Sequence, residues 1–169
     1  MKKFILGLIF AIILLTLSGC SYPSAYKGLH PLDEVVSVDI VQVGKRHRDK
    51  NNYLVGPPDL TVLAEIEDID GFLEDFSAMD CTYSFFTEPI EVYPGLIVIK
   101  FEYANGDFNL IEAETESTYY AEDNRYSAMT AFYFFDREQF DALLLKYYNQ
   151  YDPDYDRHST GNDTMCDAL

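Results

Sequence analysis

Carboxylates at alternate positions are the residues of this chain whose types and spacing could do chemistry. Asp152, Asp154 and Asp156, with Asp163 eleven residues after the first, resemble the alternating oxygen ligands of a calcium loop. The match to the EF-hand pattern is partial, because Arg157 stands where that pattern has glycine. Two interpretations stay open here, a calcium site and a solvated acidic tail.

A second set of carboxylates comes from Glu112, Glu114 and Glu116, which alternate along a predicted strand. We expect them on one side of that strand, roughly 6.5 to 7 Å apart. At that separation they could hold a cation or supply an acid and a base for glycoside cleavage, as a hydrolase would. The alternative is that the strand leaves the core at this point and the carboxylates face water.

The N-terminal residues carry a different chemistry, that of covalent lipid attachment. Lys2 and Lys3 precede an apolar run over residues 4–17, and the run closes with Leu17-Ser18-Gly19-Cys20. This combination resembles the signal of bacterial lipoproteins. The resemblance implies that residues 1–19 are a signal peptide, that Cys20 is lipidated, and that acyl chains anchor the protein to the extracytoplasmic face of the cell membrane. An uncleaved membrane helix or an ordinary secretory signal is the alternative.

The charge of the chain limits its partners. The 169 residues have a net charge of −17, and removing residues 1–19 takes away two lysines and no acidic residue, which gives −19. So negative a surface repels nucleic acid phosphates, which excludes nucleic acid binding as the main role. It also repels anionic lipid headgroups, so we expect membrane contact through the acyl anchor at Cys20 alone. No cofactor is expected beyond the calcium considered above.

Two further cysteines lie in a chain expected outside the cytoplasm, where disulfides persist. Cys81 and Cys166 therefore either form a disulfide that ties the C-terminal tail to a strand, or remain a buried thiol and a free one. Spacing alone does not decide between these two states.

The chain divides into four segments. We expect a signal peptide over 1–19, the lipidated cysteine and a tether over 20–31, one α+β domain over 32–150, and an acidic C-terminal tail over 151–169. The length suits one hydrophobic core, and the 12 Phe and 14 Tyr residues argue against disorder.

Apolar periodicity places the elements of the domain. Alternation predicts strands over 35–43, 60–66, 117–122 and 126–135 and a strand from Cys81, and helical spacing predicts a helix over 69–79. A second helix begins after an N-cap at Asp136 with Gln139 at N3, and ends before Pro153. Residues 45–50, in the loop between the first two strands, are basic and either dock an anionic group or keep that loop soluble.

A hairpin over Leu96–Ala113 is the sharpest local prediction. Asn105-Gly106 favours a two-residue type I′ turn, which fixes the register. The expected core face then holds Ile99 and the facing pairs Tyr103 with Phe108 and Phe101 with Leu110. A tight turn at Asp123-Asn124 similarly sets Glu122 opposite Arg125. The predicted fold class is α+β, an antiparallel, mostly meander sheet with two helices packed on one face.

Tyrosines offer a surface that would bind without catalysis. An exposed platform for a sugar or a peptide would consist of Tyr119, Tyr120, Tyr147, Tyr148 and Tyr151. The alternative is that these residues pack in the core and at its rim.

The segments 65–70, 95–103 and 134–140 resemble small uncharacterised lipoproteins of Gram-positive bacteria, a resemblance that implies no activity. The leading hypothesis is a non-catalytic binding module for a protein or an envelope polymer. A calcium-binding lipoprotein and a carboxylate-dependent envelope hydrolase are the alternatives.

Overall fold

The computed structural model describes residues 21–23, 26, 31–51, 55–84, 92–128 and 133–154. The predicted signal peptide, Cys20 and residues 155–169 of the predicted tail lie outside these ranges. The strands are β1 (Ser21–Pro23), β2 (Val35–Val43), β3 (Leu60–Glu65), β4 (Cys81–Ser84), β5 (Ile97–Tyr103), β6 (Phe108–Glu112), β7 (Thr115–Tyr120), β8 (Arg125–Ala128) and β9 (Tyr133–Phe135). The helices are a 3-10 turn, η1 (Leu32–Glu34), and the α-helices α2 (Ile69–Ser77) and α3 (Arg137–Tyr147).

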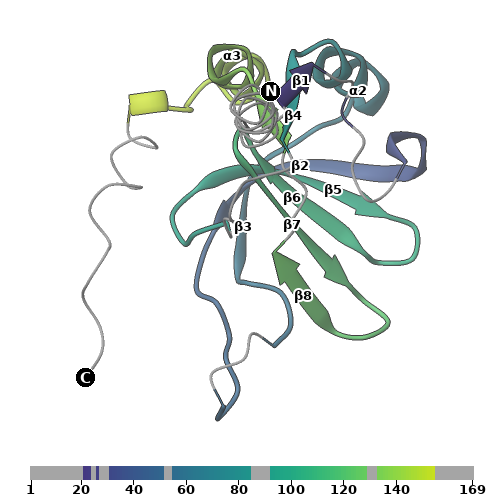
Figure 1. Cartoon of the computed structure of the whole chain (residues 1–169), viewed down its shortest axis with the longest axis vertical. Coiled ribbons are helices and arrows are strands. Elements are labelled where there is room, and N and C mark those ends of the chain that lie inside the picture. The colour runs from purple at the N-terminus through teal and green to yellow at the C-terminus, as the bar shows by residue number, and fades with distance from the viewer. Residues whose placement is uncertain are drawn as a thin grey trace, which may run out of the picture.

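Two antiparallel sheets organise the strands. Six strands form one sheet in the order β3-β2-β5-β6-β7-β8, and three form a smaller sheet in the order β1-β4-β9. Figure 1 shows the two α-helices and the small sheet gathered at one end, with the six-stranded sheet below them. The predicted α+β class is confirmed, with a sheet that is a meander from β5 to β8.

The core has two parts, one on each face of the large sheet. The first lies under the helices and joins Phe72 and Phe76 of α2 and Phe140 of α3 to Ile99 and Phe101 of β5. The second lies on the opposite face, where its buried residues are Val41, Val43, Val92, Leu96, Val98, Phe108, Leu110 and Tyr126. Both α-helices thus pack on one face of the sheet, as the sequence predicts.

Side-chain caps begin both α-helices, and the cap of the second helix is Asp136, as predicted. Asp68 accepts a hydrogen bond from the Gly71 amide at 3.1 Å, and Asp136 accepts one from the Gln139 amide at 3.0 Å. The ring of Phe135, just before the second cap, lies with its centroid 6.1 Å from that of Phe140, an arrangement known as a hydrophobic staple.

The register of the β5–β6 hairpin differs from the prediction by one residue. Glu102 faces Phe108 and Phe101 faces Asn109, because three residues form the loop instead of two. Gly106 has a positive φ of 84°, but Asn105 does not, whereas a type I′ turn needs both. A slip of one residue reverses every side chain. The predicted core face is therefore wrong for two residues: Ile99, Phe101 and Tyr103 lie under the helices, and Phe108 and Leu110 lie on the opposite face.

The second predicted turn is also longer than expected. Arg125 faces Tyr120 rather than Glu122, and Ala121 to Asn124 form the turn, with Asn124 at a φ of 47°. A slip of two residues keeps the faces unchanged. The described residues of the predicted strand over 126–135 belong to two different sheets, with β8 in the six-stranded sheet and β9 in the three-stranded one.

The segment predicted as a tether contributes to the fold where the structure describes it. β1 pairs with β4, with Tyr22 opposite Tyr83. The ring of Tyr26 packs against Phe76 and Phe135, at centroid distances of 5.3 and 5.4 Å. Residues directly after Cys20 are thus part of the folded domain rather than a spacer in front of it.

Candidate binding site

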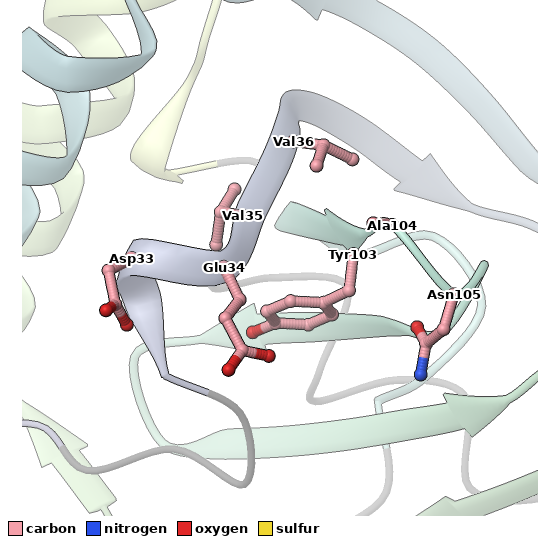
Figure 2. A pocket seen from close by; sticks show the side chains of 7 residues that line it. All are labelled: Asp33, Glu34, Val35, Val36, Tyr103, Ala104 and Asn105. Carbon is pink, nitrogen blue, oxygen red and sulfur yellow. The ribbon is translucent and has the colours of Figure 1, made fainter.

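A pocket of about 460 Å³ lies where β2 begins and β5 ends. Figure 2 shows its lining, which comes from η1 and the start of β2 on one side and from the end of β5 and its turn on the other. The lining residues are Asp33, Glu34, Val35, Val36, Tyr103, Ala104 and Asn105. This volume lies within the range of about 300 to 1,000 Å³ typical of small-ligand sites, towards its lower end.

A β-bulge shapes one wall of the pocket. Val35 faces Tyr103 in the register, but Ser37 faces Glu102, so Val36 is one residue too many on β2. Such an extra residue bends its strand and redirects a side chain. The side chain of Val36 is 52% exposed, although valine in a strand is usually buried on one face. The bulge therefore gives the pocket an accessible apolar surface.

Hydrogen bonds hold the opposite wall in one conformation. The Asn105 amide nitrogen donates to Asp107 at 2.9 Å, and the Asp107 backbone N–H donates to the side-chain oxygen of Asn105 at 3.0 Å. Asp107 is buried and its other oxygen accepts from the Ala121 amide at 2.7 Å. The turn that lines the pocket is thus tied to the neighbouring turn between β7 and β8.

The pocket is acidic. Asp33 and Glu34 are exposed, while Tyr103 is only 3% exposed. Burial raises the pKa of Tyr103 well above its usual range, and the charges of Glu116 and then Glu34 add to this effect. Among the seven residues that line the pocket, none carries a positive charge. This arrangement is suited to a cation that brings an apolar part with it.

Glu116 of β7, whose charge acts on Tyr103, is itself buried. Its Oε1 accepts hydrogen bonds from the Tyr26 hydroxyl and the Asn109 side-chain amide, both at 2.9 Å. Its Oε2 makes no hydrogen bond within the described part of the chain. Burial raises the pKa of Glu116 to about 7, and the hydrogen bond from Tyr26 opposes this rise.

Glu112 is also buried but has a charged neighbour. Its carboxylate forms an ion pair with Arg137 at the start of α3, and it accepts a hydrogen bond from the Glu114 amide at 2.9 Å. Burial raises the pKa of Glu112, and the Arg137 guanidinium opposes this rise. Glu114 itself is exposed.

The prediction that Glu112, Glu114 and Glu116 share one side of a strand is therefore wrong. Ala113 and Glu114 form a tight turn, so Glu112 ends β6 and Glu116 belongs to β7. Glu112 and Glu116 are 5% and 3% exposed, so the alternative that these carboxylates enter water holds only for Glu114. None of the three lines the pocket.

The five tyrosines predicted as a platform lie in different places, four of them in or against the two cores. Tyr119 packs beside Phe108 in the second core, and Arg125 lies over the ring of Tyr120. Tyr147 and Tyr148 pack against the first core, and Tyr151 is buried within it at 4% exposure. They do not form one exposed platform, and the alternative of core and rim packing describes them better.

The remaining predicted sites lie partly outside the described residues. The amide of Asp154 donates to Asp152 at 3.0 Å, but Asp156 and Asp163 lie outside the described ranges, so the calcium site stays a prediction. No cluster of three or more potential metal-binding side chains occurs in the described ranges.

Cys81 is buried, and its thiol is free within the described part of the chain. Burial, and then the charge of Glu116, raises the pKa of this thiol to about 11. Cys166 lies outside the described ranges, so a disulfide between Cys81 and Cys166 also stays a prediction.

Sequence reasoning missed the pocket and the burial of Glu116. The local signal for the burial of Glu116 was Asn109, a polar residue between Phe108 and Leu110. Asn109 faces Thr118 across the sheet, and its side-chain oxygen accepts a hydrogen bond from the Thr118 hydroxyl at 3.1 Å. The pocket has no local signal, because its two walls are about 70 residues apart in the chain.

Comparisons with protein-family models, with curated proteins and with solved structures find no match to this chain. Within the described ranges, no helix is both long enough and apolar enough to cross a membrane.

Proposed function

We propose that this protein is a lipid-anchored, extracytoplasmic and non-catalytic binding module for a protein or an envelope polymer. The observation that carries the proposal is the pocket of about 460 Å³, in which two exposed carboxylates stand beside a buried tyrosine and an exposed valine. A site with mixed polar and apolar walls and a fixed turn is suited to recognition. The Leu17-Ser18-Gly19-Cys20 motif supports the anchor.

The path of the N-terminal segment supports a domain held close to its membrane. Ser21 follows Cys20 directly and already belongs to β1, and Tyr26 is packed into the first core. A chain lipidated at Cys20 would therefore have almost no free spacer between its anchor and the small sheet. Such a module would meet partners that are in the membrane or within a short distance of it.

The positions of the carboxylates favour binding over hydrolysis. A pair of carboxyl groups that cleaves a glycosidic bond must flank the substrate in a shared site. Glu112 and Glu116 are buried outside the pocket, and Glu112 is engaged by Arg137. Asp33 and Glu34 line the pocket but are exposed to water, where their main effect on a ligand is electrostatic attraction.

The anchor is tested by metabolic labelling with a palmitate analogue and by fractionation of cells. The wild-type protein is expected to incorporate the label and to sediment with membranes, and Cys20→Ala is expected to lose the label. A chain that incorporates no label would contradict lipidation at Cys20.

The pocket is tested by capture from detergent-solubilised envelope, with each bound species identified by mass spectrometry. We expect the full-length protein to retain a reproducible partner and the double variant Asp33→Lys with Glu34→Lys to lose it. The matched control is Glu74→Lys with Glu138→Lys, which makes the same change of charge at exposed sites of α2 and α3 that do not line the pocket. Retention of the same partner by the pocket variant would overturn the proposed site.

A further inference from the structure

We infer that the occupant of this pocket is a basic side chain, lysine or arginine, presented by a partner protein. The inference rests on the proposed function and names the chemistry that the pocket recognises. It follows from four properties of the pocket, namely its charge, its apolar surfaces, its size and its rigidity.

The charge of the lining residues selects a cation. Asp33 and Glu34 supply two carboxylates, and no lining residue neutralises them. The chain around them has 29 acidic residues against 12 lysines and arginines, so its overall charge also favours a cation. Both carboxylates would repel an anionic ligand, and a neutral ligand would gain hydrogen bonds from them but no attraction between opposite charges.

The apolar surfaces select a cation with a hydrocarbon stem. The side chain of Val36 is redirected by the bulge and is half exposed, and Val35 stands beside it. Tyr103 adds an aromatic ring to the same lining, as Figure 2 shows. Methylene groups of lysine or arginine pack on such surfaces while the charged end remains near carboxylates. A bare metal ion would leave these surfaces unused.

Size and rigidity favour a single side chain over a polymer segment. The pocket has a volume of about 460 Å³, towards the lower end of the range for ligand sites of about 300 to 1,000 Å³. The turn that carries Asn105 is held by the buried Asp107, so that wall is already formed before a ligand arrives. A preformed site loses little conformational entropy when it binds a short ligand.

The test measures binding of single amino acid derivatives to the full-length protein, purified from membranes in a neutral detergent. The probes are Nα-acetyl-lysine methylamide and its uncharged counterpart Nα-acetyl-norleucine methylamide, which has the same stem without the ammonium group. Chemical shifts of the backbone amides are followed during titration. We expect saturable shifts at residues 33–36 and 103–105 with the lysine derivative. The affinity for the norleucine derivative should be lower by roughly tenfold or more.

The matched variants assign the effect to the carboxylates. Asp33→Asn with Glu34→Gln is expected to reduce lysine affinity to that of norleucine, and Glu74→Gln with Glu138→Gln to leave it unchanged. Equal binding of lysine and norleucine, or absence of saturable shifts at the pocket, would overturn the inference.

Glucosamine, an amine without an aliphatic stem, serves as the polymer probe. Equal binding of glucosamine would assign the pocket to an envelope polymer and overturn the assignment to a protein side chain.

Failure of this inference is distinguishable from failure of the proposed function. If the pocket variant loses its envelope partner but the protein does not distinguish lysine from norleucine, the module stands and its assigned ligand is wrong. If lysine binds at the pocket but charge reversal there leaves envelope capture unchanged, the ligand chemistry stands and the functional role of the pocket is wrong.

Discussion

Glu112 and Glu116 are four residues apart, and both are almost completely buried, but their surroundings differ. Glu112 faces the guanidinium of Arg137, a residue of α3 that also lies 3.9 Å from Glu114. Glu116 receives its hydrogen bonds from Tyr26 and Asn109, both uncharged. Burial alone favours the protonated form of each carboxyl group. A cation opposes this effect at Glu112, whereas only uncharged donors contact Glu116.

The difference shows that burial does not by itself determine what a carboxyl group does. A buried carboxylate with a cation is a structural ion pair, costly to break on one side only. A buried carboxyl group with neutral donors is a group that titrates, and its effect on stability depends on pH. Glu112 thus ties the β6–β7 turn to α3, and Glu116 makes the first core sensitive to pH.

Removal of Arg137 should have the largest effect. Arg137→Leu leaves Glu112 buried without its cation, and we expect a loss of about 4 kcal/mol in the free energy of unfolding at pH 7, as for other broken buried pairs. Urea denaturation measures this loss. The control is the double variant Glu112→Leu with Arg137→Leu, which removes both charges and should recover much of the stability. If the double variant were no more stable than the single one, the pair would not be the cause.

Replacement of Glu116 by Gln should change how stability depends on pH. The pKa of Glu116 is raised from 4.5 to about 7, so the folded protein retains this proton at pH values at which the unfolded chain has released it. The stabilisation that the raised pKa of Glu116 gives the folded protein is fully present below about pH 4.5 and is lost as the pH rises through 7. A rise from 4.5 to about 7 corresponds to about 3 kcal/mol.

The measured quantity is the difference in unfolding free energy between Glu116→Gln and the wild type. We expect this difference to move in favour of the variant by about 3 kcal/mol between pH 4 and pH 8. Other carboxylates titrate in both proteins and cancel in the difference. Glu112→Gln is the comparison variant, and because Arg137 opposes the effect of burial there, its difference should change less over the same range. A flat difference for Glu116→Gln would mean that the pKa of Glu116 is the same in the folded and the unfolded protein, so that burial does not raise it.

The sequence predicts the elements of this fold well because their signals are local. Asp136 caps α3, and Phe135, the last residue of β9, packs on Phe140 in the first turns of that helix, so neighbouring residues suffice to place the helix. The first two strands of the large sheet likewise follow from alternation, with β2 over the predicted residues and β3 ending one residue earlier. Local rules decide such features before any long-range contact forms.

Register and the sites depend on information that is not local. Asn105-Gly106 is compatible with a two-residue or a three-residue loop, and the choice reverses the faces of Phe108 and Leu110. Tyr26 and Glu116 are 90 residues apart, and their hydrogen bond requires the N-terminal segment to pack beside β4 and β9. No spacing rule in the sequence could have identified Glu112 and Glu116 as the buried members of their group.

Removal of one hydroxyl group gives the smallest and most specific test of the comparison. Tyr26→Phe keeps the ring against Phe76 and Phe135 but removes the donor to Glu116. A hydrogen bond to a charged acceptor is stronger than one to a neutral acceptor, so we expect a loss of about 2 kcal/mol at pH 8 and about 1 kcal/mol at pH 4. Chemical denaturation at the two pH values measures both.

The matched control for this variant is Tyr119→Phe, which removes a hydroxyl group whose hydrogen bond goes to the exposed, uncharged Asn124 at 3.0 Å. Its effect should be smaller than that of Tyr26→Phe and the same at both pH values, because no titrating group accepts the bond. The hydrogen bond from Tyr26 also lowers the pKa of Glu116, so Tyr26→Phe should shift the titration of Glu116 to higher pH. An equal loss at pH 4 and pH 8, without that shift, would show that Tyr26 stabilises the fold through its ring alone and that its hydroxyl does not sense the charge of Glu116.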